Sequence, residues 1–155
     1  MPLSEEAKRE IRELMAKYPR PKSALMPALY IVQREYGYVT AEGMREVAEL
    51  FGLTPAQVAS VATFYTLYFF KPVGKYVIDL CTNISCMLCG AYDIAAHLKR
   101  KLGIDFGETT PDGRFTLREV ECIGACTGAP AMQINWRLYE NLTPEKVDAL
   151  LESLP

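Results

Sequence analysis

Five cysteines are the residues of this 155-residue chain best suited to chemistry, and they fall in two short segments. The first segment is Cys81-Thr-Asn-Ile-Ser-Cys86-Met-Leu-Cys89, and the second is Cys122-Ile-Gly-Ala-Cys126. Because no cysteine occurs elsewhere, we expect the sulfurs to meet at one site. Four uses of that site are open: disulfides, a zinc ion, a dithiol redox pair or an iron–sulfur cluster.

The overall composition excludes several classes of protein. Half of the residues are hydrophobic and 23% are charged, as in folded globular domains. The net charge of −2, with both signs interspersed, predicts no nucleic-acid-binding face. No apolar run reaches the roughly 18 residues of a membrane span, and the acidic start lacks the order of a signal peptide. We therefore expect a cytoplasmic protein without direct membrane insertion, where lasting disulfides are uncommon and five cysteines cannot all pair in a monomer.

Helical apolar spacing runs through residues 1–72. Ser4, Thr40 and Thr54-Pro55 are typical helix starts, and a further helix is predicted over Ser23–Tyr36. The expected buried stripes are Ile11, Leu14, Met15, Tyr18; Leu25, Leu29, Val32, Tyr36; Met44, Val47, Ala48, Phe51; and Val58, Val61, Ala62, Tyr65. The pattern predicts a small all-α helical bundle over residues 1–72.

An aromatic run, Phe64-Tyr65-Thr-Leu-Tyr68-Phe69-Phe70, follows the last of these helices. So many large apolar side chains are seldom all exposed. The run predicts either the seam between the bundle and the next domain, which we favour, or a surface for a partner. A short linker is expected near Lys71–Gly74.

From Lys75 the apolar period changes from helical to alternating, which predicts a strand that ends at Cys81. The expected order over residues 73–155 is β-α-β-β-β-α, an α/β domain. Its further elements are a helix over 90–102, strands over 114–121, 131–135 and 138–139, and a helix from Thr143-Pro144. Both cysteine segments then follow strands, where α/β folds gather functional side chains. Asp79, inside the first strand, is expected on a solvated face.

Cysteine spacing suits several ligand sets. Cys86-x2-Cys89 with Cys122-x3-Cys126 suits zinc, and Cys86-Met-Leu-Cys89 before a helix suits a redox dithiol. A [2Fe–2S] cluster needs four thiolates. It could take the plant-type set, Cys81-x4-Cys86-x2-Cys89 with one distant cysteine, or the two pairs Cys81-x4-Cys86 and Cys122-x3-Cys126. The two-pair set draws on both strand-end loops, but spacing alone does not decide.

The combination of these motifs resembles the thioredoxin-like [2Fe–2S] ferredoxin family. Its elements are C-x4-C, about 35 residues containing Gly-Glu-Thr-Thr-Pro-Asp-Gly-Arg-Phe, C-x3-C, and then Gly-Ala-Pro-Ala-Met-Gln-Ile-Asn. Tyr36-Gly-Tyr38-Val and Val61-Ala-Thr-Phe-Tyr65 resemble that family's helical domain. The likeness covers residues from about 10 to 152, and it implies a thioredoxin-like domain over 73–155 preceded by the helical bundle over 1–72.

The resemblance also implies a ligand set. In the family, two cysteine pairs hold one [2Fe–2S] cluster, which corresponds here to Cys81, Cys86, Cys122 and Cys126. Cys89 has no place in that pattern, so we expect a buried free thiol, carried away from the loop in the first turn of a helix that starts near Gly90. The expected backbone N–H donors to the sulfurs are Thr82, Asn83, Ile84, Ser85, Gly124, Ala125 and Thr127.

Members of this family are small iron–sulfur subunits of the NADH-oxidising module of respiratory complex I, with equivalents in NAD-linked hydrogenases and formate dehydrogenases. The resemblance implies an electron-transfer subunit, first of all of NADH:quinone oxidoreductase, that exchanges single electrons with the FMN of a larger flavoprotein partner. That partner would bind NAD(H), other subunits of the host complex would be further partners, and the complex would hold the chain at the cytoplasmic face of the membrane.

No catalytic residue and no NAD or FMN site is expected in this chain itself. It contains no G-x-G-x-x-G phosphate loop, and His97 falls within a predicted helix. The alternative from a different class is a zinc-binding or thiol-redox protein.

Overall fold

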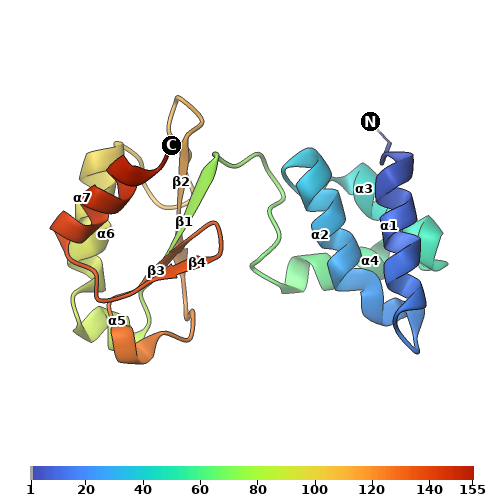
Figure 1. Ribbon diagram of the computed structural model, residues 1–155, viewed down its shortest axis with the longest axis horizontal. Coiled ribbons are helices and arrows are strands. Elements are labelled where there is room, and N and C mark those ends of the chain that lie inside the picture. Colours follow the sequence, from blue (N-terminus) through green and yellow to red (C-terminus); the bar gives the residue numbers. More distant parts are fainter. Residues whose placement is uncertain (1) are drawn as a thin grey trace. The chain divides into compact units, whose positions relative to one another are not determined.

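The computed structural model describes residues 2–155, and the chain divides between Pro72 and Val73 into two compact units (Figure 1). Met1, with which the predicted bundle begins, lies outside the described residues. Within residues 2–155 no single helix is long and apolar enough to cross a membrane. The one pair of helices that passes such a test together, Ala41–Phe51 and Pro55–Phe64, is bent by 119°.

The first unit is helical, as predicted. Its elements are α1 (Glu5–Ala16), the 3-10 turn η1 (Pro21–Ala24), α2 (Leu25–Tyr36), α3 (Ala41–Phe51) and α4 (Pro55–Phe64). The predicted starts at Ser4, Thr40 and Thr54 are confirmed, because each side chain accepts a hydrogen bond from the backbone three residues on. These caps satisfy N–H groups that a helix leaves unpaired at its first turn.

The core of this unit follows the predicted stripes, with three corrections. Ile11, Leu29 and Val47 are fully buried in it. The prediction of a helix start at residue 23 was wrong, because Pro21–Ala24 forms a 3-10 turn and α2 begins two residues later. Tyr18 and Tyr65 were wrongly placed in the stripes: both lie beyond the end of their helix and are 39% and 36% exposed.

Gln33, buried in α2, holds the segment that follows α4. Its Nε2 donates to Leu67 O at 3.2 Å, and its Oε1 accepts from Phe69 N at 2.7 Å. Between them, Tyr68 is buried in the helical core and donates its hydroxyl to Met26 O at 2.9 Å. Phe64, by contrast, is 78% exposed. The aromatic run therefore contributes one ring to the core of the helical unit, and its role as a seam between domains stays a prediction.

Gln33→Leu is expected to lower the free energy of unfolding by about 1–3 kcal/mol, because the variant keeps the side-chain volume but leaves the buried partners at Leu67 and Phe69 unpaired. Thermal unfolding of the full chain measures the loss. Limited proteolysis locates the segment that is loosened: cleavage between residues 65 and 74 should become faster in the variant. Unchanged cleavage in this segment would contradict the role assigned to Gln33.

The second unit is a sheet with helices on one side. Its elements are β1 (Tyr76–Cys81), α5 (Ile84–Leu88), α6 (Ala91–Leu102), β2 (Phe115–Val120), the 3-10 turn η2 (Cys126–Gly128), β3 (Met132–Ile134), β4 (Arg137–Tyr139) and α7 (Pro144–Ser153). The strand order is β2-β1-β3-β4, with β1 and β2 parallel and the other pairs antiparallel. The predicted β-α-β-β-β-α order is confirmed, with α5 as an unpredicted addition.

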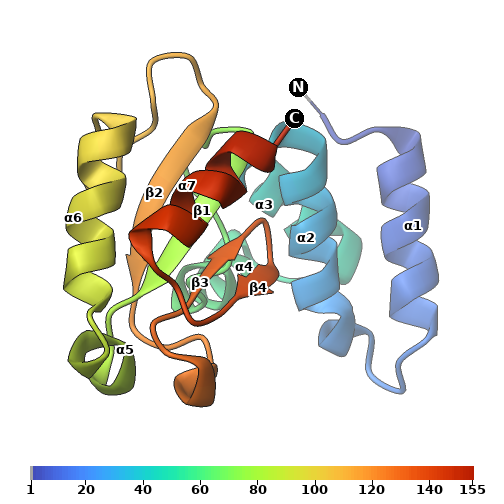
Figure 2. The same cartoon turned by 60° about the vertical axis from the view of Figure 1, so that its left-hand side comes forward.

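One face of the sheet carries the main core of this unit. Ile78, Leu80 and Leu117 are fully buried there with residues of α6 and α7, and both helices lie on the same side of the strands (Figure 2). Side chains alternate along a strand, so Val77, Asp79 and Cys81 point to the opposite face.

The prediction that Asp79 is solvated was wrong, since it is only 7% exposed. It lies on β1, which has a neighbouring strand on each side, and it pairs in register with Arg118 of β2 and Gln133 of β3. Alternation along the strand correctly separated the two faces, but it could not say that both are covered.

Candidate metal centre

The two cysteine segments meet because β1 and β2 are parallel, so their carboxyl ends reach the same edge of the sheet. Cys81 is the last residue of β1 and lies opposite Val120, two residues before Cys122. The Cys81 thiol donates to Glu121 O at 3.4 Å. The fold therefore brings the first cysteine of each segment to one edge, as the sequence predicted.

Cys86 reaches this edge on α5, the short helix that sequence analysis missed. Asn83 caps α5, with its Oδ1 accepting from Ile84 N at 2.6 Å. Asparagine is a preferred residue at this position, so this signal was present in the sequence. The turn of α5 places Cys86 with Cys81 in a small buried cluster whose other members are Ala91, Ala125 and Ala131.

The pKa of Cys86 is affected by a cysteine of each segment. Burial first, and then a hydrogen bond with Cys81, raise the pKa of the Cys86 thiol to about 11. The charge of Cys126 raises this pKa further. Cys81 and Cys126, one from each segment, thus both lie within electrostatic reach of Cys86. A metal bound here must displace the thiol protons.

The second segment forms an exposed loop whose conformation depends on backbone groups of its glycines. Gly124 N donates to Cys122 Sγ at 3.4 Å, and Gly124 has a φ of 75°, which favours glycine. Cys126 begins η2, and both cysteines are exposed. A Cβ on Gly128 would lie 2.7 Å from Cβ of Glu140. Only glycine therefore lets the connection between β4 and α7 pack against this loop.

Cys89 is the main correction at this site. The predicted buried thiol is exposed, and it is the C-cap of α5 rather than a residue in the first turn of α6, which begins at Ala91. Its N–H donates to Ser85 O at 3.1 Å. Cys89 is also absent from the buried cluster that contains Cys81 and Cys86. The prediction was wrong because it assumed one continuous helix after the loop.

Hydrogen bonds assign three of the seven predicted backbone donors. Gly124 does donate to a cysteine sulfur. Thr82 does not, because its N–H donates to Val120 O at 3.1 Å and extends the ladder between β1 and β2. Ile84 N–H is taken by the side chain of Asn83. Local hydrogen bonding therefore decides which amides remain for the sulfurs.

The donor set fits a [2Fe–2S] cluster. Each of the five cysteines is a free thiol, and four thiolates are the usual protein ligands of such a cluster. Within residues 2–155, no three Cys, His, Asp or Glu side chains converge on the position of one metal ion. The fit therefore rests on the number and the chemistry of these free thiols.

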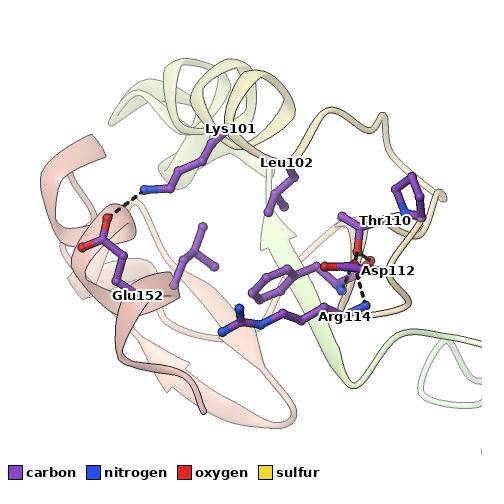
Figure 3. A pocket seen from close by; sticks show the side chains of 9 residues that line it. Lys101, Leu102, Thr110, Asp112, Arg114 and Glu152 are labelled. Carbon is purple, nitrogen blue, oxygen red and sulfur yellow. Dashed lines mark hydrogen bonds and ion pairs between the residues drawn. The ribbon is translucent and has the colours of Figure 1, made fainter.

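A pocket of about 670 Å³ lies apart from the cysteines, lined by Lys101, Leu102, Thr110, Pro111, Asp112, Arg114, Phe115, Leu151 and Glu152 (Figure 3). Lys101 binds Glu152 at 3.3 Å across it, and Asp112 accepts hydrogen bonds from Thr110 and from Arg114 N. The guanidinium of Arg114 donates to Leu154 O at 2.6 Å. The charged groups of the pocket thus all have partners within the protein, and none of its lining residues is a cysteine.

Comparison with known proteins extends this picture. A model of the family described as thioredoxin-like [2Fe-2S] ferredoxin matches residues 11–155. The chain is 49% identical over 144 residues to a subunit of the NADH-quinone oxidoreductase of Rhizobium meliloti, covering 93% of this chain and 86% of that protein. It is 43% identical over 145 residues to a subunit of the NADH-quinone oxidoreductase of Mycobacterium bovis, covering 94% of this chain and 58% of that protein.

Among solved structures, a chain of an NAD+-reducing [NiFe]-hydrogenase in the H2-reduced state is similar, with a TM-score of 0.73 and 27% sequence identity. The similarity covers 84% of this chain but only 22% of that one. The fold is thus found both in a separate subunit and as a part of a much longer chain.

Proposed function

Since the chain belongs to the thioredoxin-like [2Fe–2S] ferredoxin family, we propose that it is an electron-transfer subunit with one [2Fe–2S] cluster. The proposed ligands are Cys81, Cys86, Cys122 and Cys126. One observation carries this proposal: two parallel strands deliver both cysteine segments to one edge, where Cys81 and Cys126 act on the thiol of Cys86.

The four proposed ligands would have different surroundings and therefore different roles at this centre. When bound, the cluster supplies reversible one-electron chemistry. Cys81 and Cys86 hold its inner side, where burial among small alanine side chains excludes water. Cys122 and Cys126 hold the side nearer to solvent, and Gly124 N–H orients the sulfur of Cys122. Burial and N–H bonds to sulfur are the protein's usual means of setting a reduction potential.

The proposed partner is a larger flavoprotein subunit that binds FMN and NAD(H) and exchanges single electrons with this centre. NADH:quinone oxidoreductase is the proposed host, because relatives at 43–49% identity carry its name. The NAD+-reducing hydrogenase supports the alternative, an equivalent subunit of an NAD-linked hydrogenase or formate dehydrogenase, at 27% identity. Other subunits of the host complex would hold the chain at the cytoplasmic face of the membrane.

Residues 1–72 and 73–155 are proposed to be two domains, a helical bundle and the thioredoxin-like cluster domain. Each unit has a separate buried core of its own, which supports the division. All five cysteines lie in the second unit. The helical bundle would therefore serve attachment within the complex rather than metal binding.

Metal analysis of the anaerobically purified chain tests the proposal. We expect two iron and two labile sulfide atoms per chain, a brown visible spectrum that dithionite bleaches, and an electron paramagnetic resonance signal after one-electron reduction. A colourless protein with one zinc ion and no sulfide would overturn the proposal in favour of a zinc protein. Co-purification from the native host then identifies the flavoprotein.

A further inference from the structure

A buried ion pair lies on the face of the sheet opposite α6 and α7. Asp79 of β1 and Arg118 of β2 are directly opposite each other in the parallel register. Arg118 Nε lies 3.1 Å from Asp79 Oδ1, and the side chains of Arg118 and Asp79 are 20% and 10% exposed. Charged residues are seldom this buried unless they are paired. The two residues are therefore buried in the sheet as a specific ion pair.

This ion pair neighbours the proposed metal centre. Asp79 and Cys81 are two residues apart on one strand, so their side chains point to the same face with Cα atoms about 6.6 Å apart. Arg118 stands in the same relation to Val120, which lies opposite Cys81. The two charges thus occupy the row of the sheet next to the row that carries the first cysteine.

Asp79 Oδ1 interacts with Arg118 by charge rather than through a hydrogen bond of normal geometry. No group within residues 2–155 donates a hydrogen bond of normal geometry to Asp79 Oδ1, although Arg118 lies close to it. A buried ion pair contributes little net stability compared with apolar side chains of similar size, because both charges lose their hydration. The field of each single charge, in contrast, is strong, since the buried surroundings screen it weakly.

We propose that Asp79 and Arg118 are positioning residues that keep the charge beside the [2Fe–2S] cluster balanced and so hold its reduction potential in place. The inference rests on the proposed function. Reduction adds one electron, supplied by the redox partner, and no proton or bond change is required. The carboxylate disfavours the added negative charge and the guanidinium favours it, so the intact pair nearly cancels and either charge alone shifts the potential.

Asp79→Asn provides the test, because it removes the negative charge and keeps the shape of the side chain. In the full chain with its native cluster at pH 8, we expect about a tenfold rise in the ratio of reduced to oxidised cluster at a fixed poise, which for one electron is ~59 mV. Asp105→Asn is the matched control, since Asp105 also forms an ion pair, with Lys99 at 2.6 Å, but is 69% exposed. The cluster of this control variant should keep the wild-type reduction potential.

A double variant separates charge from structure. Asp79→Asn with Arg118→Gln removes both charges, so the reduction potential should return to near the wild-type value. If the shift in the single variant came from structural loosening instead, the double variant would be shifted at least as far. An unshifted potential in Asp79→Asn, or a double variant as shifted as the single one, overturns the inference. If Asp79→Asn does not retain a cluster, Arg118→Gln decides: a lowered potential supports the inference, and an unchanged or raised one overturns it.

Failure of this inference is distinguishable from failure of the proposed function. Wild-type protein without iron and labile sulfide ends the proposed function and this inference with it. Wild-type protein with a normal cluster and an unshifted Asp79→Asn ends only the inference. Circular dichroism and thermal unfolding of each variant verify that the fold is kept.

Discussion

Cys122→Ala and Cys126→Ala are each expected to abolish the [2Fe–2S] cluster, whereas Cys89→Ala is expected to keep it with near-normal absorbance. All three cysteines are exposed free thiols, so the substitutions are matched in chemistry and in surroundings. They differ in position, because Cys122 and Cys126 lie in the loop after β2 and Cys89 caps α5. Iron and sulfide content and the visible spectrum measure the outcome.

The physical reason is the number of ligands. A [2Fe–2S] cluster takes four thiolates, and the pairs Cys81–Cys86 and Cys122–Cys126 supply them with no spare. The plant-type set would instead use Cys89 and only one cysteine of the second loop. Loss of the cluster in Cys89→Ala, together with its retention in either variant of the second loop, would therefore replace the two-pair set by the plant-type set.

Leu80→Ala is expected to lower the free energy of unfolding of the second unit by about 2–5 kcal/mol, since it removes three buried carbon atoms and leaves a cavity in a packed core. Leu80 is fully buried with residues of α6, β2 and α7, and it immediately precedes Cys81 on β1. We expect the loss of packing to loosen the position of Cys81, and therefore to make release of iron by chelators faster as well.

Leu138→Ala is the matched control, because Leu138 lies on β4 of the same sheet but is 42% exposed. Its replacement should cost less than about 1 kcal/mol, in line with the smaller apolar area that it buries. Urea unfolding is followed by the fluorescence of Trp136, the one tryptophan of the chain, which lies in the second unit. Equal losses in the two variants would show that the sheet core is not where the structure puts it.

Helix starts and strand periods were readable in the sequence because they depend on neighbouring residues. Thr54 and Gln57 form a capping box within one turn of chain, and the alternation from Tyr76 to Leu80 reflects only the geometry of a strand. Elements shorter than about two turns carry too few residues for a periodic signal. The five residues of α5 were missed for this reason, and the expected orientation of Cys89 failed with them.

The sequence by itself determined the α/β class, the order of the strands and longer helices, and the family, because cysteine spacing and apolar periodicity are properties of the chain. The tertiary structure decided which cysteines are buried, which amides remain for sulfur, and that Asp79 is enclosed beside Arg118. The physical reason is that burial and pairing depend on groups distant in sequence. Asp79 and Arg118 are brought together only when two parallel strands align, and the same alignment brings both cysteine segments to one edge.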